Sequence, residues 1–340
     1  MSLSIIGRWA FLGLAVAATL VGCGDGGIAN TDDSGTNQGR DSGAGGFVQD
    51  DGGTGGGGGG GTTTPDAGAE PTCTGKPGAL RGKVLASVTV DGATRTFIYY
   101  APTRIEPNKP VPLVISPHGF AMVAEEMYTM TGFKEVADRE GFVAVFPDGN
   151  AFAPWNVGLD ISGVGAVVDN ILANDQGFID AIIEFAKADQ CIDTQHMFVS
   201  GFSMGGYFSN ENGCLRSDIA SIGPHSGGSH DLSQCPGSIK PVIIFHGDAD
   251  LLITYNENGV LARDRWVARN GCSTEVDTHS VYGGTCDYNR GCPAHGQVAL
   301  CHFDGMGHTW AGGLGGGRNA DLNRESASEL AWKFWKQYAW

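Results

Sequence analysis

Short runs of apolar residues alternate with longer amphipathic segments from about residue 83 to the carboxyl terminus. Val111–Ser116 and Phe142–Phe146 are continuous apolar runs, which is typical of strands buried on both faces. Gly177–Asp189 carries apolar side chains three and four positions apart, a spacing that predicts an amphipathic helix. Strands that alternate with helices in this way predict the α/β class, a mostly parallel central sheet flanked by helices on both faces.

The other expected elements continue the same alternation. Lys83–Val90 and Thr96–Tyr100 are rich in Val, Thr, Phe and Tyr, which predicts a pair of antiparallel edge strands. Further strands are expected at Met197–Ser200, Val242–Phe245 and Val298–His302, and helices at Ala124–Glu140, after Ser203 and at Arg324–Tyr338.

The amino terminus has the features of an export signal. Arg8 precedes the apolar stretch Trp9–Val21, whose 13 residues are too few for a spanning helix of about 20 but suit a signal-peptide core. Leu20-Val21-Gly22-Cys23 follows and resembles a bacterial lipobox, in which the cysteine is acylated. We therefore expect a signal peptide over residues 1–22 and a lipid anchor on Cys23. An ordinary signal peptide with a chance cysteine is the alternative.

Composition separates a tail from a domain. Between Gly24 and Thr72, 18 of 49 residues are glycine, against about 7% in an average protein, and eight acids face one arginine. This predicts a disordered tether over residues 23–72 with a mean reach of roughly 40 Å. Residues 73–340 then form one domain that is large enough for a substantial core.

The charge balance excludes some partners. The chain carries a net charge of −16. Nucleic-acid binding needs a basic face, and adhesion to anionic lipid needs a basic patch, so neither is expected. Contact with a membrane is expected only through the lipid anchor.

Export also changes the interpretation of the cysteines. An even number in an oxidising compartment predicts up to four disulfides, whose pairing the spacing leaves open. The eight are Cys73, Cys191, Cys214, Cys235, Cys272, Cys286, Cys292 and Cys301. The alternative is a zinc site built from Cys286, Cys292, His295, Cys301 and His302. No pair has the Cys-x-x-Cys spacing of a zinc knuckle, so no metal is expected.

Gly201-Phe202-Ser203-Met204-Gly205 is a Gly-x-Ser-x-Gly motif placed between an expected strand and an expected helix. A nucleophile elbow needs this context, because the serine sits on a sharp turn where strand and helix backbones pass closely. A serine is a poor nucleophile without a base that an acid holds in place. The base and the acid should therefore lie at other strand ends.

Two later loops supply candidates for these roles. Asp248 and Asp250 both follow the strand Val242–Phe245, and His308 follows the strand Val298–His302 within a glycine-rich loop. Ser203, an aspartate and His308 then occur in the order serine, acid, histidine. Spacing alone leaves Asp248 and Asp250 as alternatives for the acid.

When a serine attacks a carbonyl group, the oxyanion that forms needs two backbone N–H donors. We expect the N–H of Met204, directly after the serine, and the N–H of Phe120, in the loop that follows Val111–Ser116. His118 in the same loop is expected to be structural. Trp155 and Phe120 are candidates for the substrate pocket, although packing is the commoner role for such aromatic residues.

Six segments together resemble one family. They are Pro117-His118-Gly119, Trp155-Asn156, Asp175-Gln176-Gly177-Phe178, Gly201–Gly206, His246-Gly247-Asp248-Ala249-Asp250 and Gly307-His308-Thr309-Trp310. The set is similar to the secreted polyhydroxybutyrate depolymerase and feruloyl or acetylxylan esterase family of the α/β-hydrolases. The resemblance implies the α/β-hydrolase fold, places the acid at Asp250 and the base at His308, and needs no cofactor. Leu159–Ala173, near the expected acyl pocket, departs from the family pattern.

The sequence therefore predicts an exported serine esterase that hydrolyses feruloyl, acetyl or hydroxybutyrate esters of a polymer or its oligomers through an acyl-enzyme on Ser203. Two other classes remain open. A serine peptidase of the same fold would use the same three residues. A non-catalytic surface binding protein would usually have lost one of them.

Overall fold

The computed structural model describes residues 73–149, 155–157, 173–314 and 319–340. The expected signal peptide, Cys23, the tether and nearly all of Leu159–Ala173 lie outside these ranges. Within them, none of the helices combines the length and the apolar character that crossing a membrane requires.

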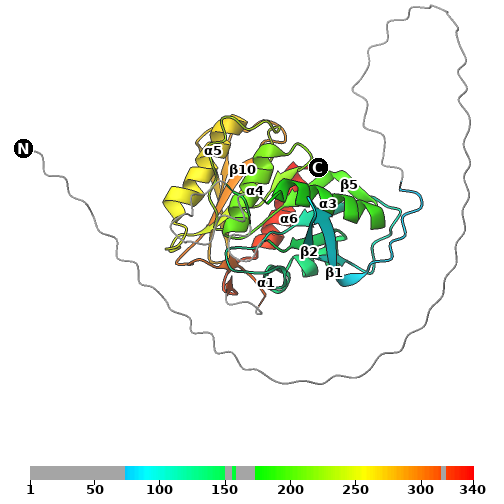
Figure 1. Cartoon of the computed structure of the whole chain (residues 1–340). Helices are drawn as coiled ribbons and strands as arrows, with labels where there is room; N and C mark the ends of the chain where they lie inside the picture. Colours follow the sequence, from blue (N-terminus) through cyan, green and yellow to red (C-terminus); the bar gives the residue numbers. More distant parts are fainter. Residues whose placement is uncertain (1–72, 150–154, 158–172, 315–318) are drawn as a thin grey trace, which may run out of the picture. The chain divides into compact units, whose positions relative to one another are not determined.

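The described residues form one large twisted sheet with a short two-stranded ribbon beside it (Figure 1). In spatial order its strands are β1 (Gly82–Val90), β2 (Ala93–Ala101), β4 (Val143–Pro147), β3 (Val111–Ile115), β5 (Ile192–Val199), β6 (Ser221–Ile222), β7 (Val242–Gly247), β10 (Val298–Phe303), β9 (Gly284–Asn289) and β8 (Val276–Val281). The ribbon pairs β11 (Trp310–Ala311) with β12 (Ala320–Asp321). The six strands from β4 to β10 are parallel to one another, and antiparallel pairs flank them on both sides.

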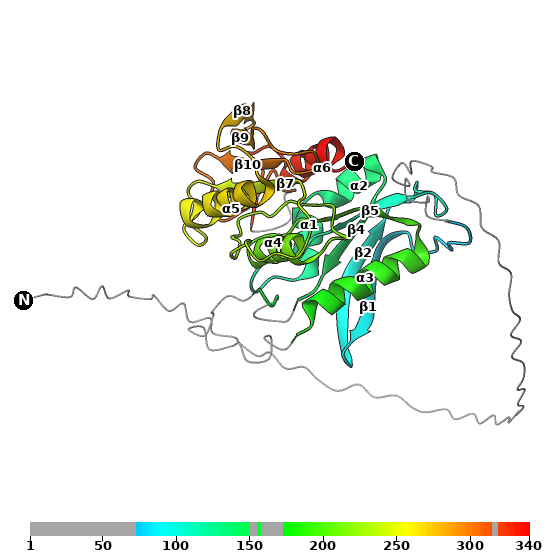
Figure 2. The same cartoon turned by 90° about the horizontal axis from the view of Figure 1, so that it is seen from above.

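Helices cover both faces of this sheet, as Figures 1 and 2 show. On one face lie α3 (Asp175–Asp189), α4 (Met204–Leu215) and α5 (Leu261–Asn270), and on the other lie α1 (Ala124–Met130), α2 (Phe133–Glu140) and α6 (Ala327–Tyr338). A π-helical turn, η2 (Tyr255–Val260), leads into α5. The expected α/β class is confirmed.

The strand period of two divides the apolar side chains between two cores. In β2, Tyr99 packs with α3 while its neighbour Tyr100 packs with α1 and α2. In β7, Ile244 and Ile243 divide in the same way. This alternation explains the continuous apolar runs in the sequence, because a strand covered on both faces has no side that prefers polar residues.

Three features differ from the expectations. The helix expected at Ala124–Glu140 is two helices, because Gly132 adopts a left-handed conformation with φ 75° that ends α1 and begins α2. Only β1 of the first antiparallel pair is an edge strand, since β2 also pairs with β4. The hairpin β8–β9 and the helix α5 were not predicted.

The eight cysteines form four disulfides, which confirms the expected number. The pairs are Cys73–Cys191, Cys214–Cys235, Cys272–Cys292 and Cys286–Cys301. Three of the thiols proposed in the alternative zinc site are thus oxidised, so that site has lost its thiolate ligands.

Candidate active site

Ser203 occupies a strained turn between β5 and α4. Its φ of 56° and ψ of −116° lie outside the regions that non-glycine residues favour, at a cost of about 1–3 kcal/mol. The turn is held by the backbone, because the Ser203 N–H donates to the His225 carbonyl at 2.9 Å and the Gly205 N–H donates to the Phe202 carbonyl at 2.7 Å. The serine therefore keeps a fixed position at the carboxyl end of β5.

The glycines beside Ser203 are required by close backbone contacts. A Cβ added to Gly205 would lie 2.0 Å from the Pro117 carbonyl oxygen, and one added to Gly201 would lie 2.4 Å from the Gly205 carbonyl oxygen. Gly119 approaches Ser203 itself, because its added Cβ would lie 3.0 Å from the serine Cβ. Gly307 is different, since no atom lies within 4 Å of its added Cβ.

His308 and Asp250 are joined by a hydrogen bond. The distance from His308 Nδ1 to Asp250 Oδ2 is 2.7 Å, and the carboxylate is buried while the ring is 14% exposed. Asp250 Oδ1 accepts the N–H groups of Leu252 and Ile253, each at 2.9 Å. Burial raises the pKa of the Asp250 carboxyl, but these hydrogen bonds outweigh it and hold the pKa below its ordinary value. The aspartate is thus ionised and fully hydrogen-bonded.

Asp248 has a different partner. Its Oδ1 accepts the N–H of Gly305 at 2.6 Å, which ties the loop after β7 to the loop after β10. Of the two aspartates that the spacing left open, Asp250 therefore contacts the histidine and Asp248 fastens the histidine's loop.

The serine turn and the histidine loop lie against each other. The ring of Phe202, the residue before Ser203, has its centre 4.8 Å from that of His308. Since β5, β7 and β10 are parallel, their carboxyl ends meet at one edge of the sheet, and this edge brings the three loops together.

The N–H groups of Met204 and Phe120 are the two donors expected to bind an oxyanion. Among the hydrogen bonds formed between described residues, neither the Met204 N–H nor the Phe120 N–H has an acceptor. Met204 is the first residue of α4, so its N–H also carries the positive end of the helix dipole. Such groups suit an anion that develops next to Ser203.

His118 supports the loop that carries Phe120. Its Nε2 accepts the Gly149 N–H at 2.9 Å, so its Nδ1 carries the proton and donates to the Gly119 carbonyl at 2.8 Å. Burial lowers the pKa of His118, which keeps the ring neutral. The Trp155 Nε1–H donates to the His118 carbonyl at 2.7 Å. The His118 ring and the Trp155 Nε1–H are therefore both used in hydrogen bonds that hold the loop.

The two candidate pocket residues differ in exposure. Trp155 is 2% exposed and stacks on Phe208 with ring centres 4.9 Å apart. Phe120 is 43% exposed and follows Gly119, the residue that approaches Ser203. Phe120 is therefore exposed enough to contact a ligand directly, whereas Trp155 is buried and supports the loop.

The comparisons with known proteins agree with this geometry. No protein-family model matches the chain. It is 32% identical to a bifunctional acetylxylan esterase/xylanase of Neocallimastix patriciarum over 56% of this chain and 26% of that one. It is 28% identical to feruloyl esterase C of Emericella nidulans over 79% of this chain and 90% of that one. Among solved structures, an esterase of Thermogutta terrifontis matches with a TM-score of 0.52, 16% identity and coverage of 75% of this chain and 92% of that one.

The chain has the α/β-hydrolase fold. The resemblance to feruloyl and acetylxylan esterases is also confirmed, because relatives named feruloyl esterase match 72% and 79% of this chain and one named acetylxylan esterase/xylanase matches 56% of it. The chain spans only 26% and 45% of the length of two of them, the enzyme of N. patriciarum and feruloyl esterase B of Piromyces equi. In the α/β-hydrolase fold the serine, acid and histidine follow one another along the chain in the order found here.

One feature of this α/β-hydrolase site was not predicted from the sequence, the role of His225. Its carbonyl holds the Ser203 N–H, and its buried ring accepts the Ala311 N–H at 3.0 Å and stacks on Trp310 with centres 4.7 Å apart. Burial lowers the pKa of His225 well below its ordinary value, with smaller effects from His246 and His308. Its position after the short strand β6 was the available signal.

His246 supports the acid from below. Its Nε2–H donates to the Ile253 carbonyl at 2.7 Å and lies 3.6 Å from Asp250 Oδ2. Burial lowers the pKa of His246, so it braces the loop after Asp250 as a neutral ring. Elsewhere in the described ranges, no group of three or more His, Cys, Asp or Glu side chains is placed to hold a metal ion.

Proposed function

We propose that this protein is a serine esterase that hydrolyses feruloyl or acetyl esters of a polysaccharide or its oligomers. The observation that carries the proposal is the hydrogen bond from His308 to a buried, ionised Asp250, beside a serine held in a strained elbow. The names of the relatives support the ester class. Hydrolysis of hydroxybutyrate esters, which the sequence motifs also allow, is an outcome that the test below distinguishes.

In the proposed mechanism His308 Nε2 takes the proton of Ser203 Oγ as this oxygen attacks the ester carbonyl. The N–H groups of Met204 and Phe120 stabilise the resulting oxyanion. The tetrahedral adduct collapses, the C–O bond to the alcohol breaks, and His308 returns the proton to the departing alcohol. Water then attacks the acyl-serine by the same route and releases the acid. Asp250 keeps the Nδ1–H tautomer of His308 and stabilises its charged form.

The proposal includes the cellular setting of the domain, residues 73–340. Four disulfides are typical of an oxidising compartment, which supports export. We further propose that Cys23 carries a lipid anchor and that residues 23–72 form the tether. Incorporation of labelled palmitate into the unaltered chain but not into Cys23→Ser would support the anchor, and equal labelling of both would contradict it.

The activity is tested with a substrate panel. Methyl ferulate, acetylated xylan oligomers, hydroxybutyrate oligomers and aminoacyl amides are offered to the purified chain and to Ser203→Ala. We expect hydrolysis of the first two and a loss of about 10⁶-fold in kcat for Ser203→Ala, because the nucleophile is absent. Ser217→Ala, an exposed serine after α4, is the matched control.

Other outcomes would point to the alternatives. Cleavage of aminoacyl amides in preference to esters would indicate a peptidase, and cleavage of hydroxybutyrate oligomers alone would indicate the polyester branch. If a fluorophosphonate probe failed to label Ser203 and no ester were cleaved, a binding protein would replace the enzyme.

A further inference from the structure

A polar groove lies where the hairpin β8–β9 extends the sheet beyond the last parallel strand. Its volume is about 520 Å³, within the range of about 300–1,000 Å³ that small-ligand sites occupy. It is lined by Asp277, His279, Tyr288, Asn289, Arg290, Gly291, Cys292, Gln297, Gln337 and Tyr338. These residues come from β8, β9, the loop before β10 and the end of α6.

Strand register explains why the groove is there. Asp277 is paired with Tyr288, so the two side chains share one face of the hairpin. This is the face that α6 covers, since the Tyr288 ring lies 6.2 Å from Phe334 and 6.3 Å from Tyr338. The last helical residue of α6 is Tyr338, and the groove lies between this end of the helix and the hairpin.

The groove is separate from the candidate active site. Tyr288 pairs with Ala299 near the start of β10, whereas Phe303, at the end of β10, leads into the loop of His308. The groove therefore lies toward the amino end of β10, and the serine lies at the carboxyl edge. A ligand bound in the groove would leave Ser203 open.

The lining has the chemistry of a site for an uncharged ligand. Its two charged groups of fixed sign, Asp277 and Arg290, form an ion pair through Arg290 Nε at 2.8 Å. Apart from His279, the other polar side chains of the lining are uncharged: the amides of Asn289, Gln297 and Gln337, beside two tyrosine rings. Such a combination suits a molecule with apolar ring faces and many hydroxyl groups.

Asn289, at the end of β9, supports the groove from within the fold. Asn289 is 3% exposed, and its Oδ1 forms no hydrogen bond with any described residue. Its Nδ2 donates to the Ser273 carbonyl at 2.9 Å, which fixes the amide's orientation. Because side chains alternate along a strand, this amide lies on the face opposite Tyr288, toward α5, and it braces the wall of the groove from behind.

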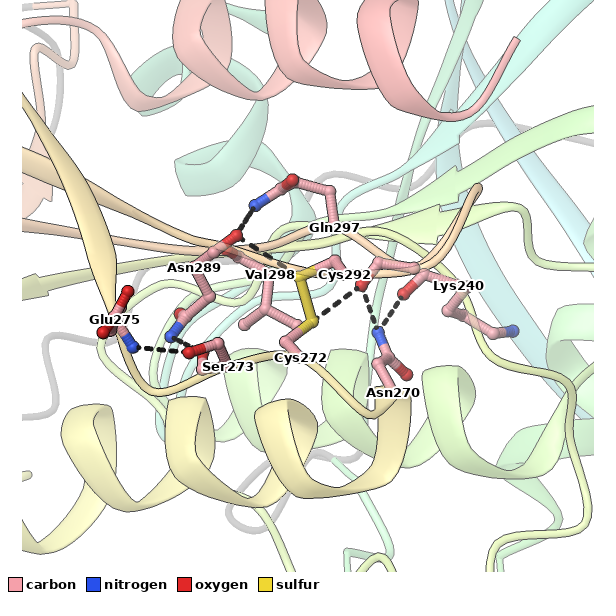
Figure 3. Close-up of a disulfide and its surroundings, with 10 residues drawn as sticks. Lys240, Asn270, Cys272, Ser273, Glu275, Asn289, Cys292, Gln297 and Val298 are labelled. Carbon is pink, nitrogen blue, oxygen red and sulfur yellow. Dashed lines mark hydrogen bonds between the residues drawn. A yellow bond between two sulfur atoms is a disulfide. The ribbon is translucent and has the colours of Figure 1, made fainter.

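The floor of the groove is rigid. Figure 3 shows the Cys272–Cys292 disulfide joining the end of α5 to the loop before β10, with Gln297 and Asn289 beside it. The Gln297 Nε2–H donates to the Asn289 carbonyl at 2.8 Å. Since these groups are ordered before any ligand arrives, binding would cost little further conformational entropy.

We propose that this groove binds a segment of the polysaccharide whose esters the active site cleaves, as a second contact outside the catalytic centre. This inference rests on the proposed function. Two contacts on one polymer chain raise the effective concentration of ester bonds at Ser203. The groove therefore holds the enzyme on its substrate between catalytic events.

Binding is tested with the full chain carrying Ser203→Ala, so that the polymer stays intact. Its association constants for xylohexaose and for insoluble acetylated xylan are measured before and after His279→Ala/Gln337→Ala and, separately, Tyr338→Ala. His279 and Gln337 are exposed, so their loss should leave the fold intact. We expect each change to weaken binding about three- to tenfold. Gln195→Ala, an exposed glutamine on β5, is the matched control and should bind as the parent does.

The outcomes separate this inference from the proposed function. Equal binding by the groove variants and the parent would overturn the groove as the binding site. Adsorption to polyhydroxybutyrate but not to xylan would overturn the carbohydrate assignment. Hydrolysis of methyl ferulate by the unaltered chain tests the catalytic proposal independently. If that hydrolysis is present and xylan binding is absent, only the groove proposal fails.

Discussion

The carboxyl edge of the parallel strands holds residues in strained positions, whereas disulfides stabilise the β8–β9 hairpin. At the carboxyl edge Ser203 sits in a strained conformation, its turn requires glycines in tight contact, and the rings of His225 and His246 are buried without charge. At the hairpin β8 is mostly polar and exposed and β9 is half-buried, but two disulfides fasten the region, Cys286–Cys301 to β10 and Cys272–Cys292 between the end of α5 and the loop after β9. The backbone strain at the carboxyl edge lowers the stability of the fold, whereas the disulfides at the hairpin raise it.

This difference predicts which variants should lose catalytic activity and which should lose stability. Changes at the carboxyl edge should reduce catalysis far more than their effect on stability suggests, because a small displacement there separates the reacting groups. Changes at the hairpin should reduce stability and leave the catalytic rate of the folded enzyme nearly unaltered. The following experiments test this division.

The largest effect is expected for Asp250→Asn. The amide cannot hold His308 in the Nδ1–H tautomer or stabilise its charge, so kcat for methyl ferulate should fall about 10⁴-fold. Asp248→Asn is the matched control: the Asp248 carboxylate accepts the Gly305 N–H and does not contact His308, so the loss should be less than about tenfold. A larger loss for Asp248→Asn than for Asp250→Asn would reverse the assignment of the acid.

The next effect concerns the hairpin. Replacing Cys286 and Cys301 by alanine removes a link across 15 residues, and the free energy of unfolding should fall by about 3 kcal/mol in urea titrations. At 25 °C the folded variant should keep most of its kcat. If the variant were as stable as the parent yet inactive, the hairpin would belong to the catalytic region and the division would fail.

A change of one methyl group tests the carboxyl edge. In Gly205→Ala the added Cβ would meet the Pro117 carbonyl oxygen at 2.0 Å, so the elbow must shift and kcat should fall about 100-fold. Gly307→Ala adds the same methyl group where no atom lies within 4 Å, so activity should be nearly unchanged. Equal activity of the two variants would show that the elbow tolerates displacement.

The sequence predicted the parallel centre well because its signals are local. Apolar runs such as Val242–Phe245 are continuous, and the three reactive residues each follow such a run. The hairpin was missed because Val276–Val281 is mostly polar and exposed, so its pattern resembles a loop. The break at Gly132 was missed because a left-handed glycine and an ordinary helical glycine look alike in a sequence.

The sequence indicated the candidate reactive residues of the site, but not the residues that hold them in place. Motif order indicated Ser203, Asp250 and His308, whose roles stay proposals. The part that His225 plays depends on the Ser203 N–H and on Ala311, 86 positions away along the chain, and no local pattern connects them. Disulfide pairing was open for the same reason, since it depends on which strands become neighbours.

The smallest effect is a pH dependence of stability at the carboxyl edge. His225 has a folded pKa well below the value of about 6.5 that it has when unfolded. Below pH 6.5 the unfolded chain therefore binds a proton that the folded chain does not, and the free energy of unfolding falls as the pH falls. One titrating group changes the free energy of unfolding by at most about 1.4 kcal/mol per pH unit, which sets the upper limit for the slope due to His225. Urea titrations of the parent and of His225→Phe measure this. The variant keeps an aromatic ring beside Trp310 but leaves the Ala311 N–H without its acceptor, so it should be less stable at pH 7.5 and lose less stability on acidification. Burial also lowers the pKa values of His118 and His246, so these two residues would account for the pH dependence of unfolding that His225→Phe still shows. If the two slopes below pH 6.5 were equal, the buried ring of His225 would not be a source of acid sensitivity, and the cost of shaping the serine turn would lie in its backbone strain alone.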